Sequence, residues 1–324
     1  MHGDSHRPSS HATLHHDRRT SEREAVIFTV ALILFIPLSC LPFAGHELFE
    51  HWQDKYLVPG TEGVLLDIHY LQTEEHIVEE MLRLLEIRNG DILYDLGCGD
   101  GRIVIQAAKK PGVRGVGVDI DPRRIAESTA NASAANVADR TTFLQQNLFE
   151  SDIRRASAVT LFLLDEINLR LRPKLFRELR PGTRIVSHNF RMGDWEADKK
   201  VSLGLRLDGF HNLYFWVIPA NVSGLWEGRH KGETWSLSVR QRFQRINGTL
   251  TINGKIALPL LEPTITGDVI RFSVRDENPG RALTFEGKVK GDVMEGLFRR
   301  IATGETRWRA TRDPATASAI DPRS

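Results

Sequence analysis

The residues best suited to chemistry in this sequence form a cluster of glycines and acids in the stretch DILYDLGCGDGRIVI, residues 91–105. An apolar run enters the cluster and a helix-like pattern follows it. Gly97, Gly99 and Gly101 remove side chains where the chain must turn tightly and where a ligand can approach the backbone. The amino end of a helix beside such a turn is a favourable place for polar groups of a ligand. The spacing therefore predicts a cofactor cradle.

Two positions in this cradle distinguish the class of cofactor. The fingerprint for dinucleotides has a third glycine where this chain has Arg102, and it does not require an acid such as Asp95 at the end of the first strand. A carboxylate there opposes a pyrophosphate but suits the ammonium of an amino-acid moiety, directly or through water. Asp119 lies about 20 residues past the loop, where a carboxylate can accept both ribose hydroxyls. Asp121 directly precedes Pro122, so a helix N-cap is the better interpretation of that acid.

The elements that must position these residues alternate along the chain. Residues 74–87 have apolar side chains at helical spacing, and residues 92–137 read as strand, glycine loop, helix, strand and helix. Such alternation predicts a doubly wound, Rossmann-like α/β sheet with its ligand at the carboxyl ends of the strands. We expect this domain to span residues 60–220.

With these residues in place, the sequence resembles the class I S-adenosylmethionine-dependent methyltransferases, whose first two motifs match DLGCGDG and GVDID. Within that class it is similar to the family of the ATP synthase c-subunit lysine methyltransferase and its bacterial relatives. The narrower likeness is carried by DIHYLQTEEHIVEEML, LYDLGCGDGRIVI, VTLFLLDEINLRLRPKL and RPGTRIVSHNFRMGDW. It covers roughly residues 67–219.

The resemblance implies that S-adenosyl-L-methionine is the cofactor. Its methionine part would be held by Asp95, Gly97, Gly99 and Gly101, and its ribose by Asp119. Tyr70 and Thr73 fall where the family has a Tyr-x-Pro-Thr-Pro segment folded over the cofactor, but here Gln72 and Glu74 replace the prolines. Asn147 stands where the family has an aspartate that contacts the adenine, and a loop asparagine is the alternative interpretation.

Polar side chains after two further strands are the candidate catalytic groups. Asp165 and Asn168 follow the apolar run in ASAVTLFLLDEIN. Asn168 matches the family, whereas Asp165 stands where the family has Leu-Pro. His188, near the end of the next strand, could take up a proton near neutral pH, with a structural histidine as the alternative. Methyl transfer to an amine depends on alignment and desolvation more than on a strong base, so a group that orients the amine suffices.

The function implied by the resemblance is N-methylation of a protein lysine, which makes a protein the expected partner. A small-molecule or lipid methyltransferase, or a module that binds the cofactor without catalysis, are the alternatives. A formal charge of +1 provides no overall basic field for nucleic acid. The histidines near the amino terminus lie in a polar lead, and we assign no metal site.

One uncharged run suggests a membrane partner. Residues 25–45 carry no charge, and a run of about 20 such residues matches the thickness of a bilayer core, so we predict a transmembrane anchor after a disordered tail over residues 1–24. A cleaved signal peptide is the alternative to the anchor. Basic residues before the run outnumber those that closely follow it, which by the positive-inside rule would place the main domain outside. The cofactor is cytosolic, and on that ground we expect the catalytic domain on the cytoplasmic side.

The last third of the chain has a different pattern of apolar and polar residues. From residue 221 to residue 312, apolar and polar residues alternate in short runs separated by glycine turns, which predicts a small antiparallel β-barrel or sandwich. Trp226, Trp235 and Trp308 are expected to be core residues of this domain. Residues 313–324 are expected to be a disordered tail.

Overall fold

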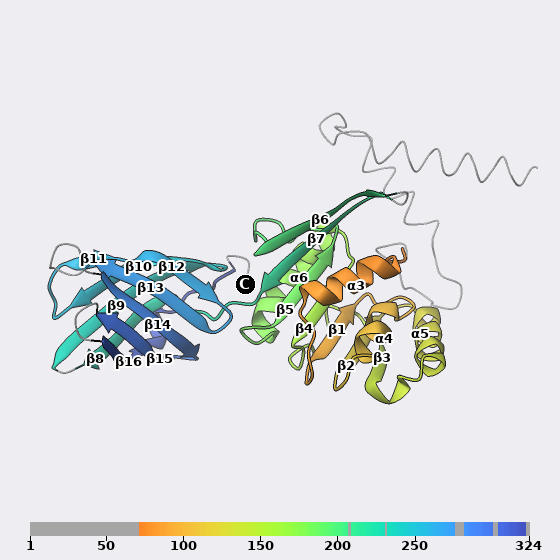
Figure 1. Cartoon of the computed structure of the whole chain (residues 1–324), viewed down its shortest axis with the longest axis horizontal. Helices are drawn as coiled ribbons and strands as arrows, with labels where there is room; N and C mark the ends of the chain where they lie inside the picture. Colours follow the sequence, from red (N-terminus) through yellow and green to blue (C-terminus); the bar gives the residue numbers. More distant parts are fainter. Residues whose placement is uncertain (1–70, 207–208, 231, 276–281, 301–303, 322–324) are drawn as a thin grey trace, which may run out of the picture. The chain divides into compact units, whose positions relative to one another are not determined.

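The computed structural model describes residues 71–206, 209–230, 232–275, 282–300 and 304–321. The predicted tail over 1–24, the predicted anchor over 25–45 and Tyr70 lie outside the described residues. The described chain forms a seven-stranded α/β sheet followed by a nine-stranded antiparallel sheet (Figure 1).

The seven-stranded sheet has the order β3-β2-β1-β4-β5-β7-β6. Its strands are β1 (Ile92–Leu96), β2 (Arg114–Asp119), β3 (Thr141–Gln145), β4 (Ala158–Leu161), β5 (Arg184–His188), β6 (Lys199–Arg206) and β7 (Gly209–Val217). Strands β1 to β5 are parallel, whereas β7 pairs antiparallel with β5 and β6 with β7. The carboxyl ends of β1, β2, β4 and β5 therefore meet at one edge of the sheet.

Helices cover both faces of this sheet, which explains why β4 and β5 are buried along their whole length. The helices are α3 (Glu75–Leu84), α4 (Arg102–Ala108), α5 (Pro122–Ala134) and α6 (Asp165–Glu178). On one face, α3 and α4 share a core with Leu93, Val186 and Leu213. On the other face, α6 packs with Val159 and Trp216. The predicted doubly wound, Rossmann-like sheet is confirmed.

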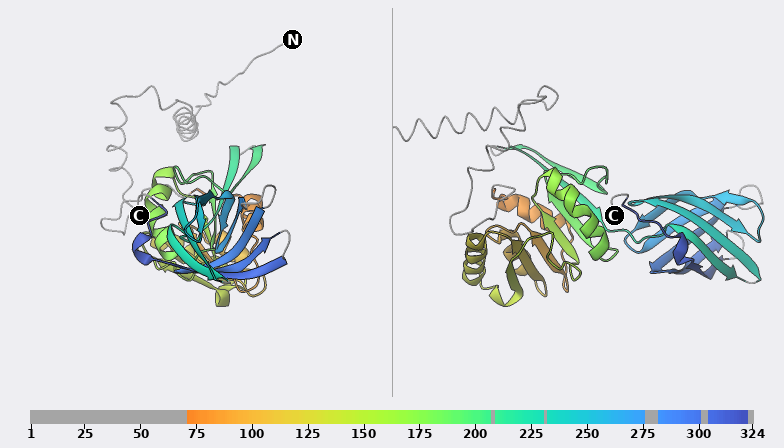
Figure 2. Two further views of the ribbon diagram at one scale, coloured as in Figure 1. Left: turned by 90° about the vertical axis from the view of Figure 1, so that its left-hand side faces the viewer. Right: turned by 180° about the vertical axis from the view of Figure 1, so that it is seen from behind.

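The nine-stranded sheet has the order β11-β10-β9-β8-β16-β15-β14-β13-β12. Its strands are β8 (Gly224–His230), β9 (Glu233–Arg242), β10 (Arg245–Ile252), β11 (Ala257–Pro259), β12 (Leu261–Thr266), β13 (Val269–Arg275), β14 (Ala282–Lys290), β15 (Val293–Arg300) and β16 (Gly304–Arg312). Its first strand pairs with its last, and the sheet curls into a nearly closed barrel (Figure 2).

The side chains inside this barrel are large and aromatic. Trp226, Trp235 and Trp308 are at most 6% exposed, as predicted for core residues. Phe272 and Phe285 stack at a centroid distance of 4.7 Å between them. The sequence left open whether this domain is a barrel or a sandwich. Its strands form one continuous curled sheet and not two facing sheets, so the domain is a nearly closed barrel.

The predicted fold class is wrong in one part. None of the helices in the described ranges is long and apolar enough to cross a membrane. The apolar run over 25–45, on which the transmembrane helix was based, lies outside those ranges. The fold class is therefore a Rossmann-like sheet with a nearly closed antiparallel barrel, and no transmembrane helix is found among the described residues.

The segment after β16 has defined contacts with the rest of the chain as far as residue 321, whereas a disordered tail was expected over residues 313–324. A short 3-10 turn over Pro314–Thr316 follows the strand. Asp321 is fully buried and forms a salt bridge of 2.8 Å with Arg172 of α6. No local sequence signal predicts a partner 149 residues away.

Candidate active site

The glycine loop lies between β1 and α4, at the edge where the parallel strands end (Figure 1). Gly97 and Gly101 have φ angles of +86° and +80°, a region that side chains rarely adopt. A Cβ on Gly101 would lie 2.7 Å from Cβ of Ser128, and one on Gly97 would lie 3.0 Å from Leu163 Cδ2. These glycines are therefore required by the turn and its neighbours as well as by any ligand.

Asp119 at the end of β2 holds the loop in shape. Its Oδ2 accepts a hydrogen bond of 2.8 Å from the N–H of Gly99, and its Oδ1 accepts one of 3.0 Å from the N–H of Asp121. Burial raises the pKa of this carboxyl, while these backbone donors act in the opposite direction. Each carboxylate oxygen has a further lone pair, so the group can accept ribose hydroxyls while it retains both loop bonds.

Asp121 has the role of a helix cap, as expected. Its side chain accepts the N–H of Arg123 at the start of α5, with Pro122 in the first turn. The carboxylate also pairs with the Arg123 guanidinium at 3.0 Å. This acid is therefore committed to the helix end.

Asp95 at the end of β1 is 3% exposed, and its Oδ1 accepts a hydrogen bond of 2.7 Å from Thr160 Oγ1 on the adjacent strand β4. Burial raises the pKa of Asp95 to about 7, and the negative charges of Asp119 and Asp100 add to the shift. No salt bridge to Asp95 is formed within the described part of the chain. A buried carboxylate of this kind fits a ligand that brings a positive charge, such as the amino-acid end of S-adenosylmethionine.

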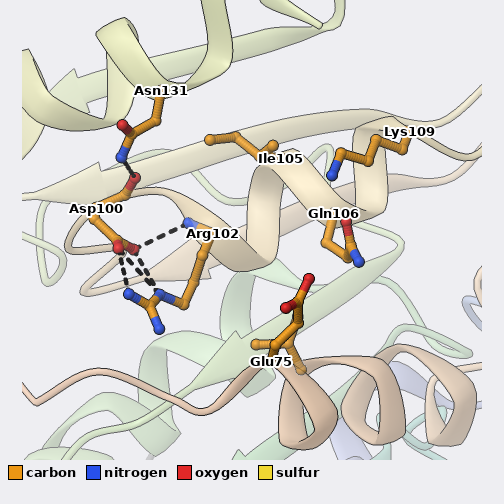
Figure 3. A pocket seen from close by; sticks show the side chains of 8 residues that line it. Glu75, Asp100, Arg102, Ile105, Gln106, Lys109 and Asn131 are labelled. Atoms are coloured by element: carbon orange, nitrogen blue, oxygen red, sulfur yellow. Dashed lines mark hydrogen bonds and ion pairs between the residues drawn. The ribbon is translucent and has the colours of Figure 1, made fainter. Parts of the chain in front are cut away.

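A link that the sequence did not reveal joins the loop to the segment before α3. Its ion pair between Arg102 and Asp100 is drawn in Figure 3. Arg102 pairs with Asp100 at 2.5 Å and also donates from Nη1 to the carbonyl of Thr73 at 2.9 Å. Thr73, the predicted cofactor-covering residue, is 5% exposed. The structure therefore places Thr73 beside the loop through its backbone.

Asn147 lies in the turn after β3. Its Oδ1 accepts the N–H of Phe149 at 3.0 Å, and its Nδ2 lies 3.4 Å from Glu150 Oε1. The side-chain oxygen therefore stabilises the turn, in line with the loop interpretation. Its amide keeps a donor suited to an adenine edge, so contact with the adenine stays a prediction.

The predicted catalytic residues Asp165 and Asn168 occupy different environments at the start of α6. Asp165 is exposed, and its Oδ1 accepts the N–H of Arg191 at 2.5 Å. Asn168 is fully buried and donates from Nδ2 to Ser187 Oγ at 3.2 Å, while its Oδ1 accepts no hydrogen bond from any described residue. Asp165 can reach a ligand directly, whereas Asn168 can reach one only if side chains around it move.

His188 at the end of β5 belongs to a small group of rings. Its Nε2 lies 2.8 Å from Nδ1 of His211 on β7, so the two imidazoles share one hydrogen bond. Phe162, just after β4, stacks on His188 with ring centroids 4.2 Å apart. His76 of α3 meets His211 edge to face at 6.2 Å. His211 was missed because its pairing depends on the β5–β7 register.

Within the described ranges, no group of three or more His, Cys, Asp or Glu side chains is arranged to hold a metal ion. Cys98, in the middle of the loop, is a buried free thiol. Burial, followed by the charges of Asp95 and Asp119, raises its pKa. The thiol is therefore neutral and acts as a small apolar group below the loop.

Known families and proteins are similar to the α/β part of the chain. A family model described as the ANTKMT methyltransferase domain matches residues 95–199. A Protein-lysine N-methyltransferase from Saccharolobus islandicus is 44% identical over 154 residues, which are 47% of this chain and 94% of that relative. The ATP synthase c-subunit lysine N-methyltransferase of Homo sapiens is 31% identical over 150 residues, which are 46% of this chain and 63% of the human protein.

Solved methyltransferase structures are similar to less than half of the chain. An RNA methyltransferase from Salinibacter ruber, in complex with S-adenosyl-L-homocysteine, is 47% identical over 47% of this chain and 96% of that chain, with a TM-score of 0.44. A SAM-dependent methyltransferase from Geobacter sulfurreducens, also with S-adenosyl-L-homocysteine, is 21% identical over 41% of this chain and 51% of that chain, with a TM-score of 0.33.

The expected resemblance is thus confirmed. Because 94% of the archaeal relative is matched at 44% identity, the chain belongs to the family of that protein-lysine N-methyltransferase, and it is an S-adenosylmethionine-dependent methyltransferase.

Proposed function

We propose that this enzyme transfers a methyl group to the side-chain amine of a protein lysine. The observation that carries the proposal is the 44% identity with the Protein-lysine N-methyltransferase of Saccharolobus islandicus, which extends over 94% of that protein. The identity covers 47% of the present chain, and the family model matches residues 95–199 of the α/β domain, so the proposed acceptor is inferred from that part of the chain.

The proposed reaction needs little more from the protein than binding and alignment. S-adenosylmethionine, when bound, supplies a methyl group on a positively charged sulfur. Asp95 and the glycine loop would hold the amino-acid end, and Asp119 the ribose. The acceptor nitrogen must be neutral at the moment of transfer and must lose a proton, which passes to a nearby base or to water.

We assign the acceptor amine to Asp165, which follows β4, and to His188 at the end of β5; His188 is 2% exposed, so it can act only if side chains around it move. Asp165 is exposed, and its second carboxylate oxygen can receive an ammonium group. His188 would accept the proton that the amine loses, and the hydrogen bond of 2.8 Å with His211 would hold its ring in place. These roles for Asp165 and His188 are part of the proposal.

Other classes of acceptor are weaker candidates. A formal charge of +1 argues against a nucleic acid, because binding to a polyanion draws most of its affinity from an excess of basic residues. A small molecule or a lipid is the alternative to a protein, and no described residue favours either one. A protein lysine is therefore the first acceptor to test.

The experiment uses the purified full chain and methyl-labelled S-adenosylmethionine, with an extract of cells that lack the gene. Protease, ribonuclease and organic solvent then divide the labelled material into protein, RNA and lipid. We expect the label in protein, and methyl-lysine by mass spectrometry after digestion. Label in RNA, in lipid or in small molecules would overturn the proposed acceptor. Cofactor binding with no label in any fraction would favour a binding module, and the Asp95→Asn variant provides the inactive control.

A further inference from the structure

The side chain of Arg102 connects the cofactor loop to the segment before α3. We propose that Arg102 is a positioning residue that fixes residues 71–73, directly before α3, against the loop and thereby sets the affinity for the cofactor. The proposal rests on the cofactor of the family and is independent of the acceptor. In the sequence, Arg102 stands out only as a departure from a glycine pattern.

The geometry of the link is specific. Arg102 Nε lies 3.0 Å from both carboxylate oxygens of Asp100, and Nη2 lies 2.5 Å from Oδ2. This arrangement leaves Nη1 to donate to the carbonyl of Thr73 at 2.9 Å. The carbonyl of Asp100 accepts Nδ2 of Asn131, on α5, at 3.0 Å. The glycine loop, α5 and the segment before α3 therefore meet at one ion pair.

Asp100, the partner of Arg102, is close to the loop residues that are expected to hold the cofactor. Asp100 lies between Gly99, whose N–H donates to Asp119, and Gly101, the N-cap of α4. Arg102 supplies the positive charge next to Asp100, and the charge of Asp100 is one of the causes that raise the pKa of Asp95. Loss of Arg102 would therefore disturb both the backbone of the segment at Thr73 and the ionisation of Asp95.

The surroundings of Arg102 make the proposal testable without unfolding the protein. Its side chain is 31% exposed and lines a pocket of about 290 Å³ between α3 and α4, together with Glu75, Gln106 and Lys109 (Figure 3). Water in this pocket can solvate Asp100 after a substitution. A variant at Arg102 is thus expected to keep its fold.

The test compares wild type and Arg102→Gln in binding to S-adenosyl-L-homocysteine by calorimetry at about pH 8, above the pKa of Asp95. Hydrogen exchange of the first turn of α3 is measured with and without this ligand. We expect the variant to bind about tenfold more weakly, the effect of one lost hydrogen bond to a charged group. We also expect ligand-induced protection of the Ile77 and Val78 amides, which bond to the carbonyl of Glu74, in wild type only.

Arg154→Gln is the matched control. Arg154 forms the same Asp-x-Arg pattern, donating from Nε to Asp152 Oδ1 at 2.9 Å, on the loop before β4 at the opposite edge of the sheet. It should bind the ligand as wild type does. Arg102→Lys keeps the charge without the planar fork, and it should lie between wild type and Arg102→Gln; it carries the test if the glutamine variant does not fold. Unchanged affinity in the Arg102 variants, or weakened affinity with protection retained, would overturn the proposal.

Discussion

At the scale of single residues, the site depends on two carboxylates, Asp119 and Asp95, that have different roles. Asp119 is held by two backbone donors and so keeps the loop closed in the absence of a ligand. Asp95 has a single described donor, Thr160, and its pKa is raised to about 7 by burial. An acid in this state gains most from a ligand that carries positive charge, because the ligand replaces the solvation that burial removed.

The pH dependence of cofactor binding follows from Asp95. Its raised pKa means that folding favours the protonated acid, so its contribution to stability is lost as the pH rises through about 7. A cationic ligand favours the ionised acid instead. We therefore expect the affinity for S-adenosylmethionine to rise between about pH 6 and pH 8, as calorimetry would show. Asp95→Asn should bind weakly at every pH; a wild-type affinity that does not change with pH would contradict this role.

Asp119 and Asp121 can be separated by substitution, although they are two residues apart. Asp119→Ala removes the proposed ribose acceptor and should weaken cofactor binding by about 1.5–3 kcal/mol, and it also leaves the N–H groups of Gly99 and Asp121 without their acceptor. Asp121→Ala removes a helix cap and should lower the free energy of unfolding by about 1 kcal/mol with little effect on binding. Equal losses of affinity in both variants would argue against the assignment.

At the scale of elements, the strand–loop–helix unit of β1 and α4 sets the site. The chain must turn at Gly97 and again at Gly101, the N-cap of α4, and both positions have positive φ. The space around Gly101 is filled by Ser128 of α5 and by the ring of Phe143 on β3. The packing of two other elements therefore fixes a position in the cofactor loop.

Gly101→Ala tests this packing. The added Cβ would lie 2.7 Å from Ser128 Cβ and 2.8 Å from the Phe143 ring, and φ is +80°. We expect a loss of roughly 2–4 kcal/mol in the free energy of unfolding, from backbone strain plus overpacking. Gly182→Ala is the control, because its φ is +91° but a Cβ there meets nothing within 4 Å. It should lose only the backbone part, about 1 kcal/mol. Equal losses in denaturant titrations would show that packing adds nothing.

At the scale of the whole molecule, the C-terminal segment returns to the α/β domain at one buried ion pair. Arg172 of α6 is fully buried and bonds to Asp321, to the carbonyl of Met192 and to Asp194. Upstream in the segment, the carbonyl of Ser318 accepts hydrogen bonds from Asn221 and Ser223. The end of the described chain is thus part of the folded structure.

Asp321→Ala should be strongly destabilising. The substitution leaves a buried guanidinium with only part of its hydrogen bonds, and breaking such a pair costs about 3–5 kcal/mol. The double variant Arg172→Met with Asp321→Leu should recover much of this loss, because neither charge then remains buried. Denaturant unfolding of the full chain measures both effects. A loss below about 1 kcal/mol, the range of a surface pair, would show that the pair is solvated in solution.

The sequence by itself determined the glycine loop, the two acids that flank it, the helix cap at Asp121 and the change to β structure after residue 221. Each depends on residues close together in the chain, because backbone angles, caps and hydrophobic periodicity are properties of short segments. Tertiary structure decided which side chains face one another. Three hydrogen bonds join residues that are far apart in the sequence: Thr160 to Asp95 with a separation of 65 residues, Arg102 to the carbonyl of Thr73 with 29, and His211 to His188 with 23. These pairs follow from strand register and from helix packing on the sheet, which form only when the whole domain folds.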